Sequence, residues 1–159
     1  MVLDTLSSTP APVVRFPVGL VGAVIATLAM DQMMARLPEG MTPPKVAAGV
    51  LTKTHPDEAP ERLAATAHYL AGAGTGLLFV WLSLAVEYVV GEASVVTVLG
   101  TTALLFVLMV GFFVVVPLPR APGLDDARRH RTGIDWAISA AAYLLVLVPV
   151  VTAGTVALA

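Results

Sequence analysis

LAATAHYLAGAGTGLLFVWLSLAVEYVV, the stretch Leu63–Val90, is long and apolar enough to decide the fold. As a helix that rises about 1.5 Å per residue, it would extend roughly 40 Å. The hydrocarbon core of a bilayer is about 30 Å thick, so the stretch can cross it with a tilt or with an extra turn outside. We therefore predict a transmembrane helix here, the second of four.

The predicted helix has two different faces. One third of its circumference carries small or polar residues: His68, Gly72, Thr75, Gly76, Phe79, Ser83 and Glu87. The opposite side carries Leu70, Leu77, Trp81, Leu84 and Tyr88. Small faces pack against other helices and large apolar faces meet lipid. Gly72 and Gly76, four residues apart, predict close approach of a neighbouring helix of the same chain, which we favour over a dimer contact.

The composition is that of a membrane protein. The chain has 159 residues, of which 57% are hydrophobic and 13% charged, and its mean hydropathy is +0.87. Soluble domains carry roughly 25% charged residues, so we expect a single membrane domain over residues 1–159 with the lipid bilayer as its main partner. A net charge of −2 gives no nucleic-acid footprint. The absence of cysteine excludes disulfides, thiolate catalysis and cysteine metal sites.

Three further spans are predicted at about residues 17–37, 94–116 and 134–157. The first has a small-residue stripe that includes Gly22 and Ala26. The third is nearly featureless and is expected to be the most exposed to lipid. A chain with four spans and short connections predicts an all-α, antiparallel four-helix bundle. Met1–Phe16 has no basic segment ahead of an apolar run, so we expect no cleaved signal peptide.

The first connection is predicted to contain a short helix at the membrane surface. Thr42 precedes two prolines and is expected to cap it, because proline suits the first helical turn. One face then carries Val46, Ala47, Val50 and Leu51. An amphipathic segment of this kind is typical of an interfacial helix between the first and second spans.

Basic residues predict the orientation. The first and third connections hold or adjoin eight of the nine: Arg36, Lys45, Lys53, Arg62, Arg120, Arg128, Arg129 and Arg131. Arg15 alone lies on the other side. Lys and Arg accumulate in cytoplasmic loops. We therefore expect a multi-pass protein of the plasma membrane, with connections 38–62 and 117–133 in the cytoplasm and both termini outside. Glu87 and Glu92, near the outer end of the second span, are expected to be exposed.

Polar groups converge near the predicted cytoplasmic side. Asp31 and His68 lie about two turns inside the first and second spans. We hypothesise that they pair, and that Asp135, Thr27, Ser139 or Tyr143 completes the site. One interpretation is a proton- or cation-binding site, because ionisable groups within a membrane face a partner, a cavity or water. The other is a satisfied hydrogen bond that fixes helix rotation, and it is favoured because both residues lie near the interface.

Other chemistries are less well supported by the residues. Met30, Met33, Met34 and Met41 fit bundle packing better than soft-metal binding, and a second histidine for haem is missing from the spans. We expect no metal and no cofactor. Arg128, Arg129 and Arg131 are candidate contacts for anionic lipid head groups. No set of nucleophile, base and orienting residue is recognisable, so an enzyme is not expected.

The first half of the chain resembles a known group of proteins. The first span reads Gly22-x-x-x-Ala26-Thr27-x-x-Met30-Asp31, a proline-rich connection follows, and His68-x-x-x-Gly72-x-x-x-Gly76 comes next. This order is similar to that of small four-span prokaryotic membrane families of unknown function, the YagU-like group among them. The resemblance implies a four-helix membrane protein in which Asp31 and His68 matter. It implies no activity.

Two classes of function remain open from the sequence. The first is a structural or accessory subunit of a membrane assembly, either a homo-oligomer or a complex with another membrane protein, which fits a chain without soluble domains. The alternative is a small proton- or cation-coupled transporter, channel or sensor that uses Asp31 and His68. The sequence does not identify an ion, substrate or partner.

Overall fold

Four long helices account for the apolar stretches of the sequence. The computed structural model describes residues 12–91 and 93–158, and within these ranges the regular elements are all helical. The long helices are α1 (Pro12–Met34), α3 (Glu61–Val90), α4 (Val95–Val115) and α5 (Asp126–Ala157). Each is long and apolar enough to cross a membrane. The predicted all-α class and the four apolar helices are confirmed.

Two of these helices begin earlier than the hydropathy suggests. α1 starts at Pro12 instead of Pro17, so Pro17 lies inside the helix. α5 starts at Asp126 instead of Ile134, because the side chain of Asp125 accepts a hydrogen bond from the backbone N–H of Arg128 at 2.8 Å. An aspartate in this position satisfies an N–H that the first turn leaves free. The charged segment predicted as a connection is therefore the beginning of α5.

The link between α3 and α4 is short, as predicted. Gly91 ends α3 with a φ of +87°, a left-handed conformation that glycine adopts without a Cβ penalty. Ser94 begins α4 with a reciprocal capping box. Its hydroxyl accepts from the N–H of Thr97 at 3.2 Å, and its own N–H donates to the Thr97 hydroxyl at 2.8 Å. These two signals fix where one apolar helix ends and the next begins.

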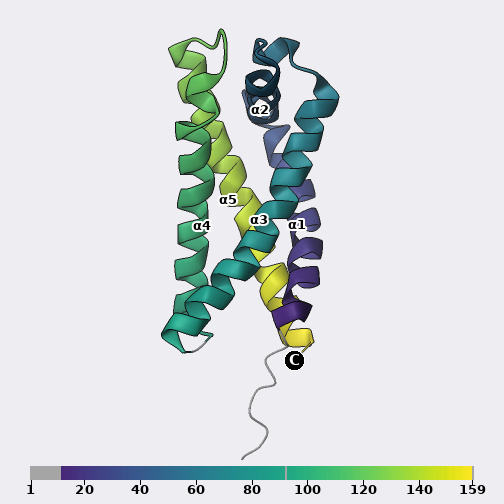
Figure 1. Cartoon of the computed structure of the whole chain (residues 1–159), viewed down its shortest axis with the longest axis vertical. Coiled ribbons are helices and arrows are strands. Elements are labelled where there is room, and N and C mark those ends of the chain that lie inside the picture. The colour runs from purple at the N-terminus through teal and green to yellow at the C-terminus, as the bar shows by residue number, and fades with distance from the viewer. Residues whose placement is uncertain (1–11, 92, 159) are drawn as a thin grey trace, which may run out of the picture.

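α1 packs against both α3 and α5, and α4 packs against the same two helices (Figure 1). α1 and α3 run in opposite directions, because each step of four residues along α1 meets a step of four backwards along α3. The facing pairs are Asp31 with His68, Thr27 with Gly72, Ala23 with Gly76, and Gly19 with Val80. α4 has 17% of its apolar window buried, against 39% for α1. The third span is thus the least covered, as predicted.

One end of the molecule carries both longer connections (Figure 1). These contain α2 (Thr42–Thr52), the short helix η1 (Pro56–Glu58) and the short helix η2 (Leu118–Arg120). α2 packs against α3, α5, η1 and η2. We call this end the α2 end, and the end with the α3–α4 turn the opposite end.

The sequence predicted the short helix but not its buried face. Thr42 is the first helical residue and Met41 takes the capping position without a side-chain hydrogen bond, so Thr42 is not the cap. Leu51 is 69% exposed, whereas Val46 is fully buried. Gly49 also faces inward, since a Cβ there would lie 2.8 Å from the carbonyl oxygen of Thr54. The helix turns the face of Val46 and Gly49 toward the other elements.

Candidate functional site

Asp31 and His68 are in contact across the α1–α3 interface. His68 Nε2 lies 2.7 Å from Asp31 Oδ1. The histidine side chain is 9% exposed and the aspartate side chain 24% exposed. The contact forms because both residues belong to the ladder of facing pairs along these helices. The predicted proximity of the two side chains is therefore present in the structure.

Tyr69 completes the contact in place of the residues expected from the sequence. Its hydroxyl donates to Asp31 Oδ2 at 3.0 Å, so both carboxylate oxygens accept a hydrogen bond. The Tyr69 and His68 rings meet edge to face with centroids 5.3 Å apart. Tyr69 is 51% exposed and lies beside the small-residue stripe of α3. A helical wheel misses it because the long tyrosine side chain reaches around the helix.

The four residues expected to complete the site bond elsewhere. The Thr27 hydroxyl donates to the carbonyl of Ala23 at 2.8 Å, and Ser139 donates to the carbonyl of Asp135 at 2.7 Å. These are bonds within a helix turn, which serine and threonine commonly make. Tyr143 donates to the carbonyl of Gly72 at 2.7 Å and thereby ties α5 to α3. None of them hydrogen-bonds to Asp31 or His68.

Asp135 holds the first connection instead of joining the polar site. It is 2% exposed, and its Oδ2 accepts from the backbone N–H of Glu39 at 2.8 Å. Its other oxygen lies 3.7 Å from Arg131 Nε. Glu39 follows the end of α1, so this contact fixes the chain after α1 to α5. A buried carboxylate must be hydrogen-bonded in this way, because burial without a partner is costly.

The small residues singled out as packing positions do bring helices together. A Cβ on Gly72 would collide with Thr27 Oγ1, and one on Gly76 would collide with Ala23 Cβ. Gly22 serves the α1–α5 interface, since its Cβ would lie 2.8 Å from Val151 Cγ2. Ala26 is completely buried. The predicted packing within one chain is confirmed at these positions.

His68 lines two cavities. The larger, about 430 Å³, lies between α1, α2 and α3, and its polar lining includes Asp31, Lys45, Glu61, His68 and Tyr69. The smaller, about 120 Å³, is lined by Met30, His68, Ala71, Gly72, Thr75, Met109, Phe112, Trp136 and Tyr143. His68 is the residue that these two linings share. His68 therefore lies between a cavity at the α2 end, whose lining includes charged side chains, and a second cavity among α1, α3, α4 and α5.

Arg128 joins the two sides of the α2 end. Its Nε lies 3.0 Å from both Glu39 carboxylate oxygens, and its two terminal nitrogens bind the Asp57 carboxylate at 2.7 and 2.9 Å. The hydrogen bond with the Arg128 guanidinium lowers the pKa of Asp57 below its ordinary value of 3.8. The guanidinium is occupied within the chain, which argues against Arg128 as a lipid contact.

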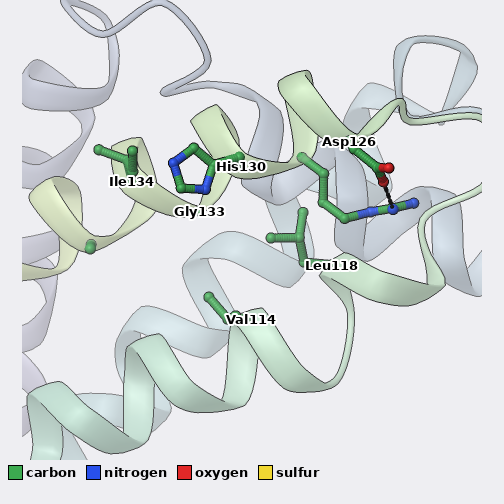
Figure 2. Close-up of a pocket in the computed structure, with 8 residues that line it drawn as sticks. Val114, Leu118, Asp126, His130, Gly133 and Ile134 are labelled. Carbon is green, nitrogen blue, oxygen red and sulfur yellow. Dashed lines mark hydrogen bonds and ion pairs between the residues drawn. The ribbon is translucent and has the colours of Figure 1, made fainter.

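Of the other two arginines of the run, Arg129 is half-buried and Arg131 is exposed. Arg129 binds Asp126 at 2.9 Å and the carbonyl of Leu124 at 3.1 Å, and the Arg131 side chain is 56% exposed. Arg129 also borders a groove of about 450 Å³ between the end of α4 and the start of α5. Figure 2 shows Val114 and Leu118 on one wall of this groove, with His130, Gly133 and Ile134 across from them. Lipid contact by Arg129 and Arg131 stays a prediction.

An ion pair at the opposite end was not expected from the sequence. Arg15 Nη1 lies 2.6 Å from Glu87 Oε2, and the two side chains are 9% and 23% exposed. The expectation that Glu87 is exposed is therefore wrong. Glu87 is covered because α1 starts early, which places Arg15 inside that helix and against α3. The signal was present in the sequence, because Arg15 is the one basic residue predicted on the outer side and Glu87 is predicted on the same side. Glu92, which was also expected to be exposed, lies outside the described residues.

Comparison with known proteins adds no assignment. No protein-family model, curated protein or solved structure matches the chain. No group of three or more histidine, cysteine or acidic side chains within residues 12–91 and 93–158 is arranged to hold a metal ion. What the polar site does is therefore inferred from its own residues.

Proposed function

We propose that this protein is a multi-pass protein of the plasma membrane, an antiparallel four-helix bundle that serves as a structural or accessory subunit of a membrane assembly. One observation carries the proposal: the ionisable side chains along the α1–α3 interface bind one another and so hold the two helices together. Asp31 binds His68 and Tyr69 near one end, and Arg15 binds Glu87 near the other. Such pairs satisfy groups that are costly to leave alone in a membrane.

The middle of the molecule supports the same proposal. Between the two polar contacts most of the packed residues are apolar, among them Ala23, Phe79, Val80, Leu105 and Leu147. The buried hydroxyls of Thr27 and Ser139 donate to carbonyl groups of their own helices. A transport path needs polar groups or water at successive depths, as in proton relays. The Asp31 side chain itself lines the cavity near the α2 end and not the apolar middle of the bundle. A path through one chain is therefore a poor fit to this core.

A proton- or cation-linked transporter, channel or sensor is the second candidate. The observation that favours it is the position of His68, which lines both cavities and contacts a carboxylate. Histidine and carboxylate side chains within membrane spans are the groups that proton relays use. A pore would require several copies of the chain, because the core of one copy is packed.

A flux measurement separates the two candidates. The purified protein is reconstituted in liposomes that contain a pH-sensitive dye, and proton flux is recorded for the wild type, Asp31→Asn and His68→Gln. The accessory proposal expects no flux above empty liposomes, together with lower stability of both variants. Flux in the wild type that either variant abolishes, while the variant stays folded, would establish the transport reading.

The proposed orientation places the α2 end in the cytoplasm and both termini outside, because the basic residues lie mainly at that end. The chain contains no cysteine, so single cysteines report their side cleanly. Lys53→Cys is expected to react with a membrane-impermeant maleimide only after the cell is opened. Tyr88→Cys, at a position that is 89% exposed, is expected to react in intact cells. The reverse pattern would invert the topology.

The absence of enzymatic activity is also part of the proposal. The Asp31 contact contains a carboxylate, an imidazole and a phenol, and both carboxylate oxygens are engaged. A nucleophilic site needs a nucleophile within reach of a base that a third group orients. The resemblance to small four-span prokaryotic membrane families implies no activity and remains a prediction.

A further inference from the structure

We propose that the smaller cavity beside His68 binds a lipid-soluble phenol, a one-ring compound with a hydroxyl group, that enters from the bilayer between α3 and α4. The inference is independent of the proposed accessory role. It begins from His68, a largely covered histidine with one hydrogen bond to a neighbouring helix. His68 is 9% exposed, and its Nε2 bonds to Asp31. Its Nδ1 has no hydrogen-bond partner among the described residues, and the side chain lines this cavity.

The polar atoms of the cavity select a hydrogen-bond donor. Asp31 accepts from Tyr69 as well as contacting His68, which favours a carboxylate and a proton on His68 Nε2. In the neutral imidazole Nδ1 is then a free acceptor. The Tyr143 proton is used on the carbonyl of Gly72, so its oxygen is also left to accept. A ligand that donates an O–H group fits both atoms, whereas a ligand with acceptors alone does not.

The apolar residues that line the cavity favour a ligand with an aromatic ring. Met30, Met109, Phe112 and Trp136 surround the polar atoms, and methionine sulfur and aromatic faces contact rings favourably. The volume of about 120 Å³ is close to that of an apolar cavity of about 150 Å³ that takes benzene in another protein. The space is therefore suited to one aromatic ring and excludes a large fused system.

The cavity is accessible from the apolar side of the molecule. Two of its lining residues are exposed: Ala71 on α3 and Phe112 on α4, the latter by 65%. Both lie in apolar helices expected to contact lipid. A compound dissolved in the bilayer would thus reach His68 without crossing the polar α2 end.

Trp136 provides the measurement, because it lines the cavity and the chain has two tryptophans. In a Trp81→Phe background the full-length protein in nanodiscs reports from Trp136 alone. The probe is 4-bromophenol, whose bromine quenches tryptophan at short range, and 4-bromotoluene is the control of similar size without a hydroxyl. We expect saturable quenching by 4-bromophenol and only gradual, non-saturating quenching by 4-bromotoluene.

A blocking variant tests the location. His68→Leu removes the acceptor but also removes one of the two partners of Asp31. The main variant is therefore Ala71→Leu, which narrows the exposed mouth. It is expected to weaken 4-bromophenol binding about tenfold or more. Gly74→Leu is the matched control, because nothing lies within 4 Å of a Cβ at that position, and it should bind as the parent does.

Three results would overturn the proposal. Quenching by 4-bromophenol that rises in proportion to its concentration would mean partition into the bilayer without a site. Equal saturable binding of 4-bromotoluene would show that the hydroxyl is not recognised. Binding that Ala71→Leu leaves unchanged would place the ligand elsewhere on the protein.

Discussion

At the scale of single residues, the Asp31 carboxylate of α1 contacts two side chains of α3. It contacts His68 at 2.7 Å and accepts from Tyr69 at 3.0 Å. The Asp31–His68 contact was predictable, because rare ionisable residues in neighbouring spans usually face each other. Tyr69 was not, since helical spacing ranks residues by the direction of Cβ and ignores the reach of a long side chain.

A double-mutant cycle measures how much the Asp31–His68 contact contributes to the free energy of unfolding. Asp31→Asn, His68→Gln and the double variant are unfolded in detergent. The coupling free energy of unfolding is expected to be about 0.6 kcal/mol and at most about 1.7 kcal/mol, the average and the maximum for hydrogen bonds in a membrane protein. Asp31→Asn combined with Thr66→Ala is the control, because Thr66 bonds within its own helix. Additive effects at Asp31 and His68 would mean that the contact contributes nothing to stability.

The Asp57–Arg128 ion pair predicts a response to acid. The hydrogen bond from Arg128 lowers the pKa of Asp57, so the pair stabilises the fold above the ordinary carboxyl value and this contribution is lost as pH falls through the lowered pKa. The melting temperature of the wild type should fall between about pH 5 and about pH 3. Asp57→Asn should show a shallower fall. Parallel curves for the two proteins would refute the assignment.

At the scale of elements, α1 and α3 can approach closely because Gly72 and Gly76 have no side chains at their interface. Helix periodicity was enough to predict that Gly72 and Gly76 face another helix. It did not predict where α1 and α5 begin, because hydropathy follows apolar residues and their first turns are polar or contain proline. That error hid the Arg15–Glu87 ion pair and left the first turns of α5 as a connection.

Two glycines on α3 give a matched test of this interface. Gly76→Ala places a Cβ against Ala23 and 2.6 Å from the carbonyl oxygen of Gly19, so it should lower the free energy of unfolding by about 1 to 3 kcal/mol. Gly74→Ala meets nothing within 4 Å and should raise it by up to about 1 kcal/mol through helix propensity. Equal effects of the two substitutions on unfolding in detergent would contradict the packing described here.

At the scale of the whole molecule, the two ends differ in chemistry. The α2 end is closed by charged contacts, with Arg128 held between Glu39 and Asp57 and with Asp135 bound to the first connection. Among the described residues, the opposite end has a short turn and the Arg15–Glu87 ion pair. α4 remains the least covered helix, so it offers the broadest apolar surface for lipid or for another protein. The amino-acid pattern predicted this asymmetry through the basic residues, but it does not identify what covers α4.

The proposed role as a subunit of an assembly is tested most directly by mass measurement. The tagged protein is purified from its native membrane in mild detergent and analysed by native mass spectrometry. We predict a complex of fixed stoichiometry, either several copies of this chain or this chain with another membrane protein. A monomer that carries only lipid, recovered under conditions that preserve a known membrane complex, would contradict the account.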